Sequence, residues 1–279
     1  MRLAVAGGTG VVGKFVVEAG QAAGHDVVAL SRGTGVDVRT GDGLAEALRE
    51  VAVIIDTTNA GSTSRDKATA FFTEVTRNLH TVGAGVGVAH LVVLSIVGLE
   101  RVPGYGYYEA KLAHEKAALA GPLPTTIVRA TQFHEFPAQI LRRTRHGPFA
   151  VMPRSRVQPV AARSVAQVLL EAAVSEAPAP GPEQEPGQER VPEREPERVP
   201  EREHGACIEV AGPERADLVS MARAVVRHRG ERVWVIPVRV PGRAGRAMRS
   251  GGQLPTLGVR VVGPSFSEWI EGADLDAVV

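Results

Sequence analysis

Short apolar runs alternate with longer amphipathic segments through the first 130 residues of the chain. The short runs are rich in valine and isoleucine, and the longer segments repeat apolar positions at helical spacing. Parallel strands joined by crossover helices produce this alternation. The pattern predicts strands at 2–7, 26–32, 52–58, 90–95 and 125–131, and helices at 12–24, 44–51, 66–85 and 107–121. It therefore predicts an α/β fold, a doubly wound parallel sheet of the Rossmann type.

The pattern becomes less regular after residue 134. It predicts a helix at 136–147, a short strand at 157–160 and a helix at 162–174, then a strand at 206–212, a helix at 216–230 and a strand at 232–238. The basic residues at the end of the first of these helices are Arg142, Arg143 and Arg145. They are most simply a solvated helix end that the helix dipole favours, although a phosphate contact stays open.

Composition changes sharply between Ala177 and His204, where proline recurs at short intervals and VPEREPER is nearly repeated. Such a segment buries too little apolar surface to offset its conformational entropy, so we predict a disordered or extended linker over 177–204. Residues 1–176 then form a nucleotide-binding domain with part of a substrate lobe from about 134. Residues 205–279 supply the last sheet strand and the rest of the lobe, which GPSFSEW near the C-terminus is expected to pack.

The overall composition describes a globular protein over most of its length. Hydrophobic residues make up 44% of 279 residues, and the formal net charge of +1 gives no reason to expect nucleic acid or an anionic membrane as partner. The longest apolar run begins at Leu91 and is too short to span a bilayer. Cys207 is the only cysteine, which excludes an internal disulfide, and the apolar run around it predicts a buried strand. We expect a cytoplasmic monomer or homodimer.

A glycine-rich loop, GGTGVVG, directly follows the first predicted strand and opens the first predicted helix. In this context glycines permit a tight turn and let backbone amides approach a pyrophosphate at the positive end of the helix. The alternative is a glycine-rich turn that binds nothing. The order of strand, loop and helix favours a dinucleotide site formed by Gly7, Gly8, Thr9, Gly10, Val11, Val12 and Gly13.

The end of the second strand indicates which dinucleotide binds. An NAD site usually carries a carboxylate there, whereas this strand ends in Ser31 and Arg32. A guanidinium can clamp a 2′-phosphate but gains little from a bare hydroxyl. We therefore predict NADP(H) in preference to NAD(H), unless Arg32 merely points into solvent.

All three tyrosines of the chain lie in GYGYYEAK, at Tyr105, Tyr107 and Tyr108. Lys111 follows Tyr107 by four positions, so the two share one face of a helix. A neighbouring ammonium favours the phenolate, which would lower the pKa of Tyr107 toward neutrality and suit it to acid–base chemistry. Ser95 ends the preceding strand, where ligands of parallel sheets bind. The alternative is that these residues only pack; Tyr108 is less well placed for chemistry, and Tyr105 is expected to line a pocket.

These motifs together, with the LSR and TIVRATQF strand ends, resemble the short-chain dehydrogenase/reductase superfamily. The likeness is greatest to its atypical NmrA-like, NAD(P)H-binding branch, which is related to the extended epimerases. The resemblance implies that Tyr107 is a proton donor and that Lys111 lowers its pKa and holds the nicotinamide ribose. It also implies that Ser95 orients the substrate.

The same resemblance implies further cofactor contacts. Thr57, Thr58 and Asn59 would run beside the cofactor, Thr131, Gln132 and Phe133 would border the nicotinamide, and Asp42 would lie near the adenine. One segment departs from the family, because Ala162–Ala166 reads ARSVA where relatives resemble ARDVA. The carboxylate at that helix start is replaced by Ser164, a hydroxyl that can still cap a helix.

The function implied is hydride transfer to or from a small carbonyl, enone or quinone-like compound. Two alternatives stay open: a sensor that binds NADP(H) without turnover, and an epimerase or dehydratase that retains its cofactor. The chain has no His-Glu-x-x-His, no Gly-x-Ser-x-Gly and no P-loop ending, since Phe15 follows Lys14, so we expect no metal, hydrolase or ATPase site. His134 beside Glu135 is expected to be a pocket wall or a satisfied polar pair.

Overall fold

The computed structural model describes residues 1–175 and 206–273, so the predicted linker lies outside the described residues. Its centre is a seven-stranded sheet in the order β12-β9-β5-β4-β3-β1-β2, in which every neighbouring pair is parallel. The strands are β1 (Arg2–Ala6), β2 (Asp26–Leu30), β3 (Val53–Asp56), β4 (His90–Ile96), β5 (Thr125–Ala130), β9 (Cys207–Ala211) and β12 (Arg260–Val261). The doubly wound α/β class is confirmed, and the first five strands lie within two residues of their predicted ends.

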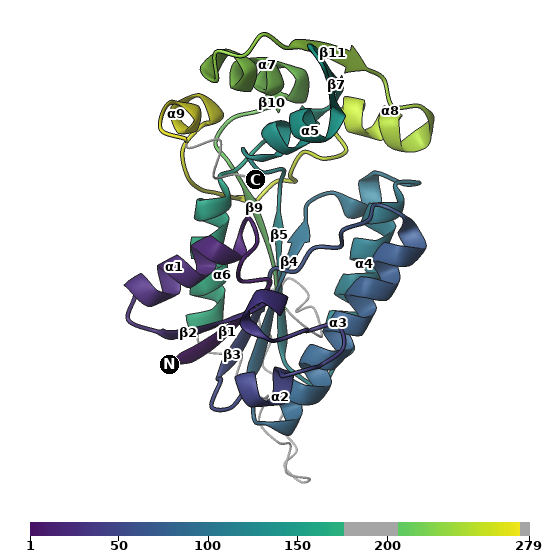
Figure 1. Cartoon of the computed structure of the whole chain (residues 1–279). Coiled ribbons are helices and arrows are strands. Elements are labelled where there is room, and N and C mark those ends of the chain that lie inside the picture. The colour runs from purple at the N-terminus through teal and green to yellow at the C-terminus, as the bar shows by residue number, and fades with distance from the viewer. Residues whose placement is uncertain (176–205, 274–279) are drawn as a thin grey trace, which may run out of the picture.

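Helices cover both faces of this sheet (Figure 1). On one face lie α1 (Gly13–Ala22) and α6 (Ala162–Val174), and on the other lie α2 (Leu44–Ala47), α3 (Arg65–Gly85) and α4 (Gly106–Leu119). Alternate residues of β1 therefore join different cores: Leu3 and Val5 pack under α1 and α6, whereas Ala4 and Ala6 face the other cluster. Burial on both faces explains why the strands are continuously apolar.

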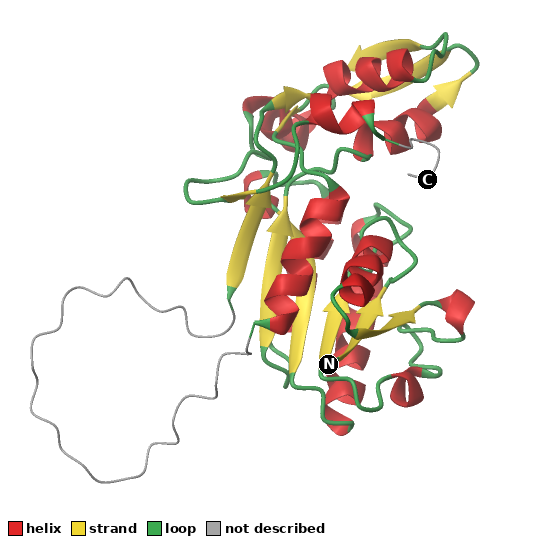
Figure 2. Ribbon diagram, turned by 90° about the vertical axis from the view of Figure 1, so that its left-hand side faces the viewer, coloured by secondary structure: helices red, strands yellow, loops and turns green. Residues whose placement is uncertain are grey.

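A second lobe sits beyond the carboxyl ends of the sheet strands (Figures 1 and 2). Its helices are α5 (Phe136–Thr144), α7 (Leu218–His228), α8 (Gly242–Ser250) and α9 (Phe266–Glu271). Its strands are β6 (Arg145–His146), β7 (Phe149–Pro153), β8 (Arg156–Val157), β10 (Ala216–Asp217) and β11 (Trp234–Val238). Two 3-10 turns, η1 (Arg32–Thr34) and η2 (Leu99–Arg101), complete the described elements. Phe266 and Trp269 stack at 5.7 Å and pack on the lobe core, as expected for GPSFSEW.

Several elements late in the chain differ from what the sequence pattern predicted. Strand β7 was not predicted, because its buried residues are only Ala150 and Met152 and its parallel partner β11 lies some eighty residues away. The predicted strand at 157–160 is reduced to the short β8, which pairs with β10 in the next part of the chain. The predicted strand around Cys207 exists, but its thiol is exposed, since only the far end of β9 is buried.

Gly13 tests the packing of α1 on β1. A Cβ at this position would lie 2.2 Å from the carbonyl oxygen of Gly7, with backbone as the obstacle. We expect Gly13→Ala to lower the free energy of unfolding by about 1–3 kcal/mol, the usual cost of overpacking. Urea denaturation measures it. Gly85→Ala is the control, because a Cβ at Gly85 meets nothing within 4 Å; equal stability of the two variants would contradict the packing argument.

Candidate functional site

The glycine loop is a tight turn between β1 and α1. Gly7 has a φ of +74°, its amide donates to Leu30, and its carbonyl accepts from the Gly10 amide at 2.9 Å. A Cβ on Gly8 would lie 2.8 Å from that of Ala29, so this glycine lets the loop sit close to β2. Thr9 and Gly10 are exposed. The turn therefore brings the helix start close to the sheet and leaves backbone uncovered, which fits a pyrophosphate.

The segment after β3 connects this loop to the tyrosine cluster. The Thr57 hydroxyl donates to the Ala6 carbonyl at 2.8 Å. A Cβ at Gly7 would lie 3.1 Å from the backbone carbonyl of Thr57, so the two segments are in close contact. Two residues later, Asn59 Oδ1 accepts a 2.6 Å hydrogen bond from the Tyr107 hydroxyl. The structure thus brings together the glycine loop, the end of β3 and the start of α4.

Tyr107 is partly buried, with the ring of Phe72 edge-on at 6.0 Å. Burial raises the pKa of the Tyr107 phenol, the neighbouring Tyr105 and Tyr108 raise it further, and Arg143 lowers it. The prediction that this pKa is lowered is wrong for this structure, since desolvation outweighs the nearby positive charge. Tyr107 is a protonated phenol at neutral pH.

Lys111 lies on the same face of α4 but turns inward. Its ammonium donates to the Leu94 carbonyl at 2.8 Å, lies 2.9 Å from His114 Nδ1 and sits 4.6 Å over the ring of Phe72. Burial lowers the pKa of Lys111 to about 8, against the opposing effects of Asp56 and Glu115. The lysine is therefore a buried cation beneath the site, and its hydrogen bonds go to α4 and β4 and not to the Tyr107 hydroxyl.

Tyr108 ties the lobe to the sheet. Its hydroxyl accepts hydrogen bonds from Gln132 Nε2 at 3.2 Å and from Gln253 Nε2 at 2.6 Å. Burial raises the pKa of Tyr108 to about 12. With both amides donating to it, this phenol is held in a structural role, while Tyr105 packs beside it with ring centroids 5.0 Å apart.

Three predicted site residues carry buried polar atoms that have no hydrogen-bond partner within the described part of the chain. They are Thr58 Oγ1, Ser95 Oγ and Gln132 Oε1. They belong to the ends of the neighbouring strands β3, β4 and β5. An unpaired buried polar group costs about 1–3 kcal/mol, so three at one edge of the sheet call for an explanation. Protein covers them here, so a ligand would reach them only after a side chain or the lobe moves.

The other predicted contacts are placed less directly. Arg32 is exposed at the end of β2, and the Ser31 amide donates to Thr34 Oγ1 at 3.1 Å. Asp42 is exposed in a turn, where its carboxylate accepts from Thr40. After β5, the Thr131 hydroxyl donates to the Gln158 carbonyl at 2.6 Å and Phe133 bridges to Val160. These last two residues join the sheet to the lobe, so their hydrogen bonds are structural.

The sequence analysis missed Asp56 and His114. Asp56 ends β3 and its Oδ2 lies 3.1 Å from His114 Nε2, with both side chains almost fully buried. A signal was present, because His114 is seven positions after Tyr107 and three after Lys111, a spacing that puts all three on one helix face. A carboxylate closing an apolar strand is a second signal.

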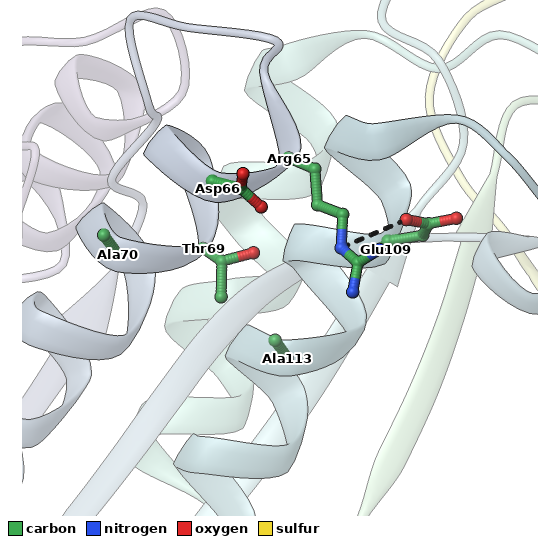
Figure 3. A pocket seen from close by; sticks show the side chains of 6 residues that line it. All are labelled: Arg65, Asp66, Thr69, Ala70, Glu109 and Ala113. Atoms are coloured by element: carbon green, nitrogen blue, oxygen red, sulfur yellow. Dashed lines mark ion pairs between the residues drawn. The ribbon is translucent and has the colours of Figure 1, made fainter.

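A surface groove lies on the outer side of α3 and α4 (Figure 3). Arg65 and Glu109 form an ion pair across it with a 3.4 Å separation of Nε and Oε2. Ala70 and Ala113 also line the groove (Figure 3). It lies at the N-terminal turns of α3 and α4, and none of the predicted site residues lines it, so we assign it no role in the chemistry.

Comparison with known structures agrees with the fold. The sequence matches no protein-family model and no curated protein. A short-chain dehydrogenase/reductase superfamily protein from Agrobacterium tumefaciens with bound NAD is similar, with a TM-score of 0.63, 18% identity, and 99% of this chain and 97% of that chain covered. The chain has the same fold as that protein.

Two further structures share this fold across almost their whole length. MoeE5 in complex with UDP-glucose and NAD has a TM-score of 0.70 and 15% identity, with coverage of 99% of this chain and 98% of that one. The dTDP-4-dehydrorhamnose reductase from Bacillus anthracis in complex with NADP has a TM-score of 0.63 and 15% identity, with 97% of each chain covered. Assignment to the NmrA-like branch stays a prediction.

Within this fold, the start of α6 shows how the departure at Ala162–Ala166 is accommodated. Ser164 lies inside the first turn and caps nothing. Both carboxylate oxygens of Glu135 instead lie 3.4 Å from the Ala162 amide. The carboxyl group of Glu135 thus meets the open amide at the start of α6, while burial favours its protonated form. His134 beside it is buried against Phe266 and Trp269, and its Nε2 hydrogen-bonds the Pro264 carbonyl at 3.1 Å. Its Nδ1 has no partner among the described residues, so the expected polar pairing is only half made.

The described segments of the chain are residues 1–175 and 206–273. Neither range contains a group of three His, Cys, Asp or Glu side chains arranged to hold a metal ion. None of the helices in them is long and apolar enough to cross a membrane.

Glu135 gives the protein a pH dependence that can be measured. Burial raises its pKa from 4.5 to about 7, so the folded protein binds more protons than the unfolded chain between these values. The contribution of Glu135 to stability is therefore greatest below pH 4.5 and declines as pH rises through 7, by roughly 3 kcal/mol at most. We expect Glu135→Gln to flatten this decline in urea denaturation at pH 5 and pH 8. Glu46→Gln is the control and should leave the decline unchanged, because the Glu46 side chain is exposed. A Glu135→Gln stability profile that matches wild type would show that Glu135 does not cause the decline.

Proposed function

We propose that this protein is an NADP(H)-dependent oxidoreductase of the short-chain dehydrogenase/reductase type that reduces a small carbonyl, enone or quinone-like substrate. The observation that carries the proposal is the hydrogen bond between the Tyr107 hydroxyl and Asn59. It puts an ionisable phenol at the carboxyl ends of the strands, one short segment away from the glycine loop. Ligands of open parallel sheets bind at this edge.

The cofactor would be held by the loop from Gly7 to Gly13, by the segment from Thr57 to Asn59 and, at its 2′-phosphate, by Arg32. The turn of the loop and its uncovered backbone fit a dinucleotide. When bound, a nicotinamide cofactor supplies hydride chemistry. The unpaired groups of Thr58, Ser95 and Gln132 would gain partners on that side of the sheet. Ser95 would orient the substrate oxygen.

Tyr107 would donate its proton to the substrate oxygen. Its raised pKa keeps the phenol protonated at neutral pH, so it begins in the state that a donor needs. A carbonyl that gains hydride becomes an alkoxide, which is more basic than a phenolate and can still take this proton. The raised pKa therefore favours the reductive direction. Removal of a proton from an alcohol would require the phenolate, which burial disfavours.

The two parts of the chain would divide the task. Residues 1–176 would bind the cofactor, and the lobe that begins near residue 134 and resumes after 205 would close over the substrate. Support for this division comes from the Tyr108 hydroxyl, which joins Gln132 of the sheet to Gln253 of the lobe. Two of the similar structures are MoeE5 in complex with UDP-glucose and a dTDP-4-dehydrorhamnose reductase. Sugar nucleotides therefore belong among the substrates to test.

A second candidate function is a sensor that binds NADP(H) without turnover. Two observations favour it: the pKa of Tyr107 is raised, and Lys111 bonds to Leu94 and His114. The two candidates differ in NADPH oxidation across a panel of aldehydes, ketones, quinones and 4-ketosugar nucleotides. A sensor would bind NADPH tightly and oxidise it with none of them.

Tyr107→Phe tests the proton donor. We expect kcat to fall by about 100-fold or more, the usual contribution of a positioned acid, with NADPH affinity changed only slightly. Stopped-flow NADPH oxidation and fluorescence titration measure the two quantities. Tyr105→Phe is the matched control and should keep most of the rate. Equal rates for Tyr107→Phe and wild type would remove Tyr107 from the mechanism.

Arg32→Ala tests cofactor choice. We expect wild type to bind NADPH about tenfold or more tightly than NADH, since a guanidinium–phosphate pair is worth about 1.5–3 kcal/mol. The variant should lose that preference while its NADH affinity stays the same, so NADH is the internal control. Isothermal titration measures both. Equal affinities in wild type, unchanged by the substitution, would overturn the assignment.

A further inference from the structure

Beneath Tyr107, three ionisable side chains form one buried hydrogen-bonded chain. Asp56 Oδ2 lies 3.1 Å from His114 Nε2, and His114 Nδ1 lies 2.9 Å from Lys111 Nζ. All three are at most 3% exposed. The ring of Phe72 covers them, since it stacks on His114 at 4.7 Å and lies under the Lys111 ammonium at 4.6 Å. The chain is therefore closed off from water.

The order of donors in this chain follows from chemistry. An ammonium can only donate, so His114 Nδ1 must accept from Lys111. The proton of the neutral ring then sits on Nε2 and donates to Asp56. Burial and the Lys111 charge lower the pKa of His114, which keeps the ring neutral. The Asp56 carboxylate selects this tautomer, because it can only accept.

Asp56 is also the anion that balances the lysine. Burial acts to raise the pKa of Asp56, but hydrogen bonds from His114 and Thr58 outweigh it and the pKa is lowered. The other nearby carboxylate, Glu115, is held by Arg129 through bonds of 2.5 and 2.8 Å. Arg129 also pairs with Glu100 at 2.7 Å, so it compensates the charge of Glu115 only in part. Of the groups facing Lys111 from β3 and α4, Asp56 is the main one that offsets the ammonium, ahead of Glu115.

We propose that Asp56 and His114 are positioning residues that keep Lys111 charged and fixed beneath the site, with the Asp56 carboxylate acting through the His114 tautomer. In Asp56→Asn the amide N–H can donate to His114 Nε2, and His114 can then adopt the tautomer with its proton on Nδ1. Lys111 can then accept a hydrogen bond from Nδ1–H only as the neutral amine. The charge on Asp56 therefore sets the charge on Lys111. The consequence for turnover rests on the proposed function, but the coupling itself does not.

Lysine NMR measures the coupling directly. The chain has only four lysines, Lys14, Lys67, Lys111 and Lys116, so 13Cε-lysine signals can be assigned by substituting each of the others with arginine. Lys111 should titrate near pH 8 in wild type. Asp56→Asn and His114→Leu should each lower this midpoint by about one pH unit or more, as the loss of a buried counter-charge does. Glu109→Gln is the control and should leave it unchanged, because the Glu109 carboxylate pairs with Arg65 on the outer side of α4.

Unchanged Lys111 midpoints in both Asp56→Asn and His114→Leu would overturn the proposal. A measurement on wild type keeps it testable if those variants do not fold. The 15N shifts of His114 between pH 6 and 7.5 should show a neutral ring protonated on Nε2. An imidazolium or a proton on Nδ1 would refute the tautomer assignment.

Turnover supplies a separate readout. If the protein reduces carbonyls, the alkaline limb of its pH profile should shift with the Lys111 midpoint in Asp56→Asn, and a limb that stays in place while the midpoint moves would remove the role in turnover. If no substrate is reduced, the proposed function fails, and the two NMR measurements still decide the coupling.

Discussion

The close approach of α1 to β1 at the glycine loop is the contact on which the site depends. Gly13 packs against the Gly7 carbonyl where no side chain would fit, and the positive φ of Gly7 turns the chain there. This contact puts the helix start at the same sheet edge as the end of β3. Because parallel strands end at one edge, the Thr57 segment and the Tyr107 helix start are then within reach of the loop.

Polar contacts join the lobe to this edge. Tyr108 receives amides from both parts of the chain, Glu135 meets the start of α6, and His134 reaches the Pro264 carbonyl near α9. Each contact buries a polar group, so each costs free energy if its partner is lost. The lobe is therefore held in one orientation over the strand ends. Any movement that uncovers Ser95 or Gln132 must break some of these bonds.

The chemistry beneath the tyrosine depends on desolvation more than on proximity. Tyr107 and Lys111 share a helix face, yet burial raises the pKa of one and lowers that of the other. Helical spacing is a statement about Cβ positions, whereas a pKa depends on what surrounds the polar atom. Here the Lys111 ammonium hydrogen-bonds His114 and the Leu94 carbonyl, and not the Tyr107 hydroxyl. The aromatic ring of Phe72 then separates this cation from water.

The sequence by itself determined the doubly wound sheet, the glycine loop and the set of residues at the strand ends, because periodicity and strand order depend on local spacing. It also predicted that Tyr107 would meet the strand ends. Only the tertiary structure decided that Lys111 turns toward Asp56 and His114, that the Glu135 carboxyl group meets the start of α6, and that β7 pairs with β11. These contacts join residues far apart in the chain, and their energies depend on burial, which no local pattern specifies.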